Sequence, residues 1–158
     1  MKKKILCILL LIFAVKVGAS TGRSIYNFDF DWLFSRYGLQ ADGTRLEEPV
    51  AAESILFDDR NWKQLDLPHD WAIEGPFRPD LEGFTGKLPW RGIGWYRKHF
   101  EVEKKDEGKR LYLDFDGAMA HAEVWLNGKK VGGHPYGYTS FRVDLTPAVV
   151  YGGENVVA

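Results

Sequence analysis

Cysteine is almost absent from this sequence. The single cysteine among 158 residues is Cys7, and it lies in an apolar run near the N-terminus. If that run is a leader that is removed, the remaining chain has no thiol, and disulfide bonds and cysteine-based metal sites are excluded. Hydrophobic residues make up 45% of the chain, which is enough to bury a core in one domain of ordinary size.

A strong excess of charge is also lacking. The formal net charge is −1, and the only basic block is formed by Lys2, Lys3 and Lys4 at the N-terminus. Nucleic-acid binding needs a basic surface that neutralises phosphates, so the composition argues against a nucleic-acid partner. Without residues 1–19, the chain would be mildly acidic.

Several local signatures of catalysis and metal binding are missing. The four histidines have neither the i, i+4 spacing of a helical metal site nor a short ligand motif. No serine lies in a nucleophile-elbow context, and the glycines between residues 83 and 94 do not open a helix as a phosphate-binding loop does. The sequence therefore predicts no metal, no cofactor and no self-contained active site.

The N-terminus has the features of a secretory signal peptide. The lysines are followed by the apolar run Ile5–Val15 and then by Val17-Gly18-Ala19. A transmembrane helix needs about 20 apolar residues, so this run is too short for stable membrane insertion. We expect cleavage after residue 19, a secreted or periplasmic product, and one domain over residues 20–158. A retained anchor is the alternative.

The rest of the chain is patterned for β-strands. In the stretch Leu111–Leu145, apolar residues recur at every second position in three runs, which places one face of a sheet against a core. Asn127-Gly128 separates two such runs and predicts a type I′ hairpin turn, because both residues tolerate positive φ. A β-sandwich is expected. Further predicted strands are Ser24–Phe34, Lys63–Leu67 and Trp95–Val102.

Irregular segments separate these strands. Residues 35–53 are expected to form an exposed loop, and residues 57–62 an Asp-capped helical turn. The long segment Pro68–Gly94 is rich in proline and glycine, and its aromatic residues argue against disorder. Loops of this length inside compact domains are usually functional or disordered, so this one is a candidate functional loop.

The carboxylates divide into two groups. Those on predicted strands alternate with core residues and are interpreted as solvated strand-face residues: Asp114, Asp116, Glu123 and Asp144. Asp70 differs, because it lies in His69-Asp70-Trp71 at the start of the long loop. It either orders the loop through a hydrogen bond to the backbone or contacts a ligand, and the sequence leaves both open.

The C-terminal residues Asn155–Ala158 begin a strand that no turn signal follows. This pattern predicts an incomplete final strand, as in a truncated product, with an open sheet edge and marginal stability. A short but sufficient terminal strand is the alternative.

Four motifs, in order, resemble the N-terminal sugar-binding domain of glycoside hydrolase family 2, in its β-galactosidase-like branch. They are LPHDW (67–71), GIGWYRKHF (92–100), the long stretch 111–146 and GGENVVA (152–158). The resemblance covers residues 25–158. It is specific to the family and not to a substrate, because galactosidases, glucuronidases and mannosidases share the scaffold.

The resemblance implies a galactose-binding-like jelly-roll fold, followed in the family by an immunoglobulin-like domain and a catalytic barrel. No catalytic residue carries over, because nothing matches the context of the family's catalytic glutamates. The positions that match loops facing the barrel's pocket are His69, Asp70, Trp71 and Tyr136. They are predicted to bind a galactoside-like carbohydrate, since rings stack on sugars and carboxylates accept from hydroxyls; packing of the loops or of a domain interface is the alternative.

Three functional hypotheses follow. The chain is the non-catalytic N-terminal part of a secreted glycosidase, which hydrolyses O-glycosyl bonds only when joined to a barrel. Alternatively, it is a stand-alone carbohydrate-binding module, or a non-functional gene remnant.

Overall fold

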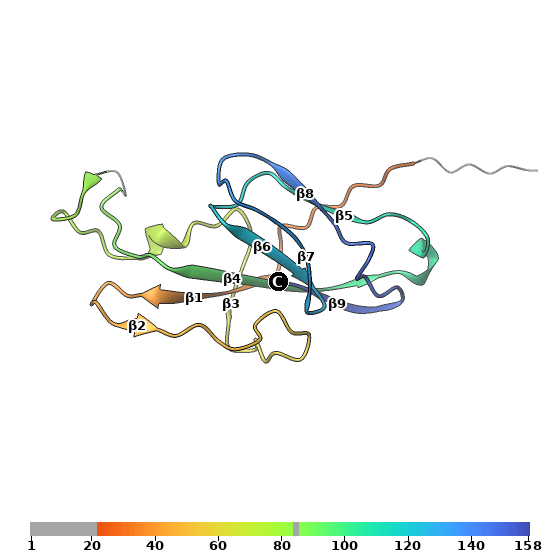
Figure 1. Cartoon of the computed structure of the whole chain (residues 1–158), viewed down its shortest axis with the longest axis horizontal. Helices are drawn as coiled ribbons and strands as arrows, with labels where there is room; N and C mark the ends of the chain where they lie inside the picture. The colour runs from red at the N-terminus through yellow and green to blue at the C-terminus, as the bar shows by residue number, and fades with distance from the viewer. Residues whose placement is uncertain (1–21, 84–85) are drawn as a thin grey trace, which may run out of the picture.

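The structure is a computed structural model that describes residues 22–83 and 86–158 (Figure 1). The predicted signal peptide lies outside these residues and stays a prediction. Within them, the regular elements are antiparallel strands and two short 3-10 helices, η1 (Trp71–Glu74) and η3 (Lys104–Asp106). The strands are β1 (Trp32–Leu39), β2 (Arg45–Leu46), β3 (Lys63–Leu65), β4 (Ile93–Val102), β5 (Tyr112–Phe115), β6 (Ala122–Leu126), β7 (Lys129–His134), β8 (Phe141–Asp144) and β9 (Gly153–Val157).

The strands form two sheets. The larger sheet has the order β2-β1-β4-β9-β6-β7, and β3 also pairs with β1. The smaller sheet contains β5 and β8, and Figure 1 shows it above β6 and β7. The predicted all-β sandwich is therefore confirmed, while its jelly-roll connectivity stays a prediction.

The core is made by alternate residues of the strands. Its buried members come from β1, β6, β8 and β9 and from the residue after β8, namely Trp32, Val124, Leu126, Val143, Leu145 and Val157. Half-buried rings close the edges of this cluster, among them Phe28, Tyr96, Phe100 and Phe141. The period-two pattern of the stretch Leu111–Leu145 thus predicted the inward face correctly.

The predicted hairpin turn is present. Asn127 and Gly128 have φ values of 53° and 80°, the left-handed conformation that a type I′ turn requires. The second arm of the hairpin is β7, so the stretch contains four strands where three were expected. The Asn127 side chain also accepts from the backbone N–H of Val156 at 2.8 Å and donates to Asn155 Oδ1 at 2.9 Å, which fixes the turn to β9.

The first strand begins later than predicted. Ser24–Phe34 was expected to be extended, but β1 runs from Trp32 to Leu39, into the segment expected to be an exposed loop. Asp31 has a φ of 59°, and its backbone N–H donates to Asp66 Oδ1 at 2.9 Å, so the strand cannot extend upstream of it. The aromatic residue Phe28 still packs against Trp32, with ring centroids 5.8 Å apart, but from irregular backbone.

The Asp-capped turn expected at residues 57–62 is present as a single hydrogen-bonded turn, although it is not assigned as a helix. Asp58 Oδ1 accepts from the backbone N–H of Arg60 at 3.2 Å, and the Asp59 carbonyl oxygen accepts from the backbone N–H of Trp62 at 2.9 Å. Trp62 does act as the packing residue that was expected. Its ring lies against those of Phe57 and Tyr37, with centroids 5.4 and 6.4 Å away, because Tyr37 on β1 supplies the partner surface.

The outer face of β4 is buried at Trp95 and Arg97, whereas His99 and Glu101 farther along the same face are exposed. The segment of residues 48–59 covers it: Trp95 Nε1 donates to Glu48 Oε1 at 2.7 Å, and Arg97 Nε donates to Asp59 Oδ2 at 2.7 Å. Arg97 is completely excluded from solvent. Alternation along β4 is therefore correct, and the first half of the strand is also covered on its outer face.

Candidate functional site

The His69-Asp70-Trp71 motif forms the entry to η1. His69 is nearly buried, with 11% of its side chain exposed, and its ring lies against Phe34 at a centroid distance of 4.7 Å. Its Nδ1 is 2.9 Å from the hydroxyl of Tyr96, and its Nε2 is 3.0 Å from Glu74 Oε1. Both ring nitrogens are thus engaged within the protein.

Both hydrogen-bond partners of His69 have shifted pKa values. Burial, together with the carboxylates of Asp70 and Glu74, raises the pKa of Tyr96 to about 12, so its hydroxyl stays protonated. Hydrogen bonds from Lys63 and His69 hold the pKa of Glu74 below its ordinary value. The ionised Glu74 therefore accepts a hydrogen bond from Nε2–H of His69, and the protonated Tyr96 hydroxyl is the partner of Nδ1.

Asp70 is the N-cap of η1. Its Oδ1 accepts from the backbone N–H of Ala72 at 2.9 Å, which is the loop-ordering bond that the sequence offered as one alternative. The residue is exposed. Contact between its carboxylate and a ligand stays a prediction.

Trp71 is held against the sheet. Its indole occupies the space that the bare backbone of Gly94 leaves, since a Cβ on Gly94 would lie 2.9 Å from Trp71 Nε1. The guanidinium of Arg36 lies 5.7 Å from the Trp71 ring centroid and 4.2 Å from that of Trp90. Cation–π contact with both rings ties the long loop to β1, and Trp71 presents only part of its surface to solvent.

The loop at residues 134–138 has a different character. Tyr136 and Tyr138 are 56% and 77% exposed, and their rings meet edge to face with centroids 5.6 Å apart. The base of the loop is fixed, because His134 stacks on Phe141 at 5.0 Å and its Nε2 lies 2.8 Å from Thr139 Oγ1. The loop therefore presents two exposed rings from a fixed base.

The strand register places the His69-Asp70-Trp71 turn and the loop at residues 134–138 at the same end of the larger sheet. These two segments together are called the rim. Val157 of β9 lies opposite both Lys98 of β4 and Leu126 of β6. Gly94, which supports Trp71, lies four residues before Lys98. Ala122 lies four residues before Leu126. The backbone N–H of its neighbour His121 donates to the Pro135 carbonyl oxygen at 3.2 Å. No hydrogen bond or ring contact joins the two loops directly within residues 22–83 and 86–158.

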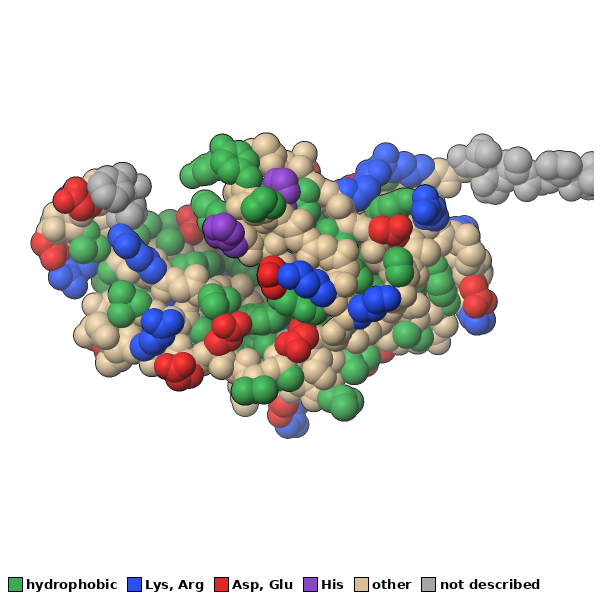
Figure 2. All heavy atoms as spheres, in the orientation of Figure 1, with side chains coloured by type: hydrophobic (Ala, Val, Ile, Leu, Met, Phe, Trp, Pro, Cys, Tyr) green, Lys and Arg blue, Asp and Glu red, His purple; other side chains and the backbone are tan. Residues whose placement is uncertain are grey.

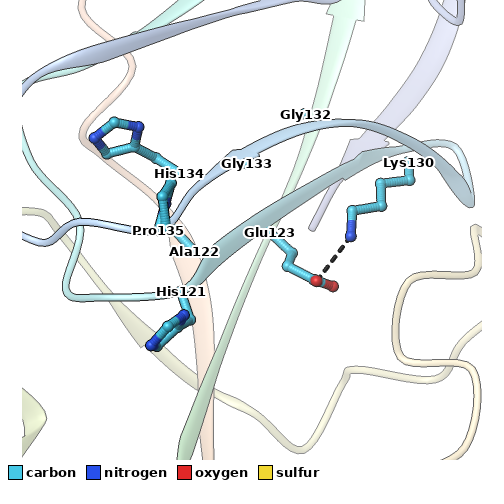
Figure 3. Close-up of a pocket in the computed structure, with 8 residues that line it drawn as sticks. All are labelled: His121, Ala122, Glu123, Lys130, Gly132, Gly133, His134 and Pro135. Atoms are coloured by element: carbon cyan, nitrogen blue, oxygen red, sulfur yellow. Dashed lines mark ion pairs between the residues drawn. The ribbon is translucent and has the colours of Figure 1, made fainter.

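A hollow of about 250 Å³ lies on the β6–β7 hairpin, beside the base of the loop at residues 134–138 (Figure 3). Glu123 and Lys130 form an ion pair of 2.7 Å along its side. Sequence reasoning missed this hollow. The sequence feature that indicates it is the pair Gly132-Gly133 inside a strand, because glycines in a strand mark a close approach of another backbone. A Cβ on Gly133 would lie 2.5 Å from the Ala122 carbonyl oxygen.

The strand carboxylates form surface pairs and caps, in keeping with their interpretation as strand-face residues. Asp114 accepts two hydrogen bonds from the guanidinium of Arg142, at 2.5 and 2.9 Å. Asp144 accepts from the backbone N–H of Thr146 at 2.9 Å. Among the described residues, no group of three or more potential ligands could hold a metal ion, and no helix is long and apolar enough to cross a membrane.

Comparison with known proteins gives one consistent group of relatives. A family described as "Glycosyl hydrolase 2 galactose-binding domain-like" matches residues 65–158. The β-galactosidase BoGH2A of Bacteroides ovatus is 44% identical over 134 residues, which cover 84% of this chain and 14% of that protein. A β-glucuronidase of Formosa agariphila is 32% identical over 145 residues, which cover 90% of this chain and 14% of that protein.

Solved structures agree with these relatives. A β-glycosidase from Bacteroides vulgatus superposes with a TM-score of 0.69 and 36% identity, over 83% of this chain and 16% of that chain. A β-glucuronidase from glycoside hydrolase family 2 also gives a TM-score of 0.69, with 30% identity over 84% of this chain. The chain thus spans 14% of the length of each of the two curated relatives.

Proposed function

Because the chain belongs to the glycosyl hydrolase 2 galactose-binding domain-like family, we propose that it is the non-catalytic domain of a secreted glycosidase. In this proposal, its rim lies beside a separate catalytic domain and contacts the carbohydrate substrate there. Relatives named β-galactosidase and β-glucuronidase support a β-linked galactoside or glucuronide as the substrate class.

The observation that carries the proposal is the contrast between the two loops of the rim. The His69-Asp70-Trp71 turn is locked by internal contacts, whereas Tyr136 and Tyr138 stand exposed on a fixed base. An exposed aromatic ring held in place is suited to packing on the C–H face of a sugar or on a neighbouring domain. The locked turn then supports the rim, and Tyr136 makes the contact.

The chemistry of the rim supports a non-catalytic role. Glycosidases need two carboxyl groups about 5 to 9.5 Å apart, one of them with a raised pKa so that it can act as an acid. On the rim, the pKa of Glu74 is held low by Lys63 and His69, and Asp70 accepts the capping hydrogen bond of η1. Neither group has the environment of a general acid.

The test is a comparison of the isolated chain with a fusion. In the fusion, this chain replaces the matching segment of the Bacteroides ovatus β-galactosidase. We expect no turnover of nitrophenyl β-galactoside by the isolated chain, activity in the fusion, and no activity in the relative from which the segment is deleted. Turnover by the isolated chain, or a fusion no more active than the deletion, would contradict the proposal.

Secretion is part of the same proposal and has its own test. Expression with the native N-terminus, followed by N-terminal sequencing of the exported protein, should show a mature start after Ala19. Recovery of the uncleaved chain from the membrane fraction would support a retained anchor instead.

A further inference from the structure

Asn127-Gly128 is the only asparagine–glycine pair in the sequence. Such a pair is chemically labile, because glycine has no Cβ to hinder its backbone nitrogen as it approaches the side-chain amide of the preceding asparagine. Asn127 is half-buried, whereas Gly128 is exposed. Two exposed lysines, Lys129 and Lys130, follow the turn, and Figure 2 shows basic side chains at the surface over the β6–β7 hairpin. Water therefore reaches the glycine side of the turn.

Asn127 joins the hairpin to β9 through both its backbone and its side chain. Its backbone N–H donates to the Val156 carbonyl oxygen at 2.8 Å, and its Oδ1 accepts from the Val156 N–H at 2.8 Å. In an antiparallel ladder, a residue exchanges both bonds through its own N–H and C=O. Here the side-chain amide takes the place of the backbone carbonyl, next to the pair Leu126↔Val157.

The other end of the Asn127 amide faces two acceptors. Its Nδ2 donates to the Ala148 carbonyl oxygen at 3.0 Å and to Asn155 Oδ1 at 2.9 Å. Asn155 is completely buried, and its own amide is held at both ends by Val150, with distances of 2.7 and 2.8 Å. The Asn155 amide therefore cannot turn to offer a donor to residue 127 without losing its bonds to Val150.

This arrangement distinguishes an amide from a carboxylate at position 127. A carboxylate can still accept from the Val156 N–H, but an ionised carboxylate has no hydrogen to donate. It would place a negative oxygen against the Ala148 carbonyl oxygen and Asn155 Oδ1, and both acceptors would lose their donor. Unpaired polar groups in such a place cost more than the hydrogen bonds themselves contribute.

We propose that Asn127-Gly128 is a deamidation site which the fold protects, and that its modification releases the β6–β7 hairpin from β9. The Gly128 nitrogen attacks Asn127 Cγ and forms an N–Cγ bond. The Cγ–Nδ2 bond breaks, and Nδ2 leaves as ammonia with the proton of the Gly128 amide. Water then opens the cyclic imide at one of its two carbonyls and leaves aspartate or isoaspartate, so the net reaction consumes one water and releases one ammonia.

The hydrogen bonds of the side chain account for the protection. Attack requires Asn127 Cγ to swing toward the Gly128 nitrogen, but Oδ1 and Nδ2 are held by Val156, Ala148 and Asn155. These three bonds must open first, so the rate in the folded protein depends on how often the hairpin separates from β9. Once residue 127 is a carboxylate, the original contacts cannot form again. Each opening therefore carries a risk of a one-way change.

The hairpin that would be released also carries part of the rim. β7 ends at His134, whose ring stacks on Phe141 at 5.0 Å and forms the base of the loop at residues 134–138. Deamidation at the turn would loosen this base from the opposite end of the hairpin. The modification and its effect on stability involve no sugar, so the inference stands apart from the proposed function.

The first test follows deamidation of the unmodified chain by peptide mass spectrometry at mildly alkaline pH, in buffer and in urea that unfolds the protein. We expect the rate at Asn127 to be about tenfold or more slower in buffer. In urea, Gly128→Ala should slow the reaction at Asn127, because the new Cβ hinders the attacking nitrogen. An equal rate at Asn127 in the folded and unfolded chain would overturn the proposed protection.

The second test uses Asn127→Asp as the product of the reaction and Asn61→Asp, at an exposed asparagine, as the matched control. We expect Asn127→Asp to lower Tm by about 3 °C or more and to speed hydrogen exchange at the Val156 amide about tenfold or more. Asn61→Asp should change neither. Equal Tm values for the two variants, or unchanged exchange at Val156 in Asn127→Asp, would overturn the proposed release of the hairpin.

Discussion

Arg97 and Asp59 form an ion pair that is almost completely removed from solvent. Arg97 Nε donates to Asp59 Oδ2 at 2.7 Å, and the two side chains are 0% and 8% exposed. Arg97 also donates to the carbonyl oxygens of Ala52 and Ser54, so it fastens the segment of residues 48–59 to the outer face of β4. This segment covers the face opposite the core at Trp95 and Arg97.

The first prediction concerns this pair. Arg97→Met should destabilise the protein by about 3–5 kcal/mol, because it leaves the carboxylate of Asp59 buried without its guanidinium. The double variant Arg97→Met/Asp59→Leu should recover a large part of that loss, since apolar replacement of a buried pair is often neutral. Urea unfolding measures both. A double variant no more stable than the single one would show that Asp59 is not the source of the loss.

The second prediction is a pH dependence at His99, whose ring lies between Asp59 and Glu154 at 2.9 and 3.0 Å. Partial burial lowers its pKa, but the hydrogen bonds to the two carboxylates outweigh this, and the pKa lies above the ordinary 6.5. A raised pKa in the folded state stabilises the protein fully below pH 6.5, and this contribution is lost as the pH rises through the folded pKa.

The measurement is the difference in Tm between the unmodified chain and His99→Gln at pH 5.5 and pH 9. We expect the difference to be larger at pH 5.5. The control is His121→Gln, at a histidine without an ion pair among the described residues. A difference for His99→Gln that stays constant over this range would contradict the proposed charge interaction.

The third prediction concerns the support of the rim. In Gly94→Ala, the new Cβ would lie 2.9 Å from Trp71 Nε1 and 3.1 Å from Phe34 Cε2, so the indole must move. We expect a loss of about 1–3 kcal/mol and a shift in tryptophan fluorescence as Trp71 becomes more exposed. Gly83→Ala is the control, because nothing lies within 4 Å of its Cβ position. Equal effects of the two changes would mean that Trp71 does not depend on Gly94.

The sequence predictions that were confirmed rest on local patterns. The alternation from Leu111 onward and the Asn127-Gly128 turn depend on neighbouring residues, and both were confirmed. The first strand failed because the alternation of residues 25–32 is interrupted by the positive φ of Asp31, whose backbone bonds to the distant Asp66.

Long-range partners explain what the sequence could not show. The burial of Arg97 depends on its partner Asp59, which lies 38 positions away in the chain. The locking of His69 likewise depends on Tyr96, 27 positions away. The candidate residues were found from motifs, but only the strand register shows that Trp71 and Tyr136 belong to one rim. The role of Tyr136 in binding stays a prediction.

The most direct test of the proposed function is the effect of Tyr136→Ala on kcat/KM for nitrophenyl β-galactoside in the fusion with the Bacteroides ovatus enzyme. A ring contact of about 1–1.5 kcal/mol predicts a fall of about tenfold. The matched control is Tyr26→Ala, at a tyrosine that is 80% exposed and lies outside the rim, which should leave kcat/KM unchanged. Equal kcat/KM in the Tyr136→Ala and Tyr26→Ala fusions would contradict a role for this rim in handling the substrate.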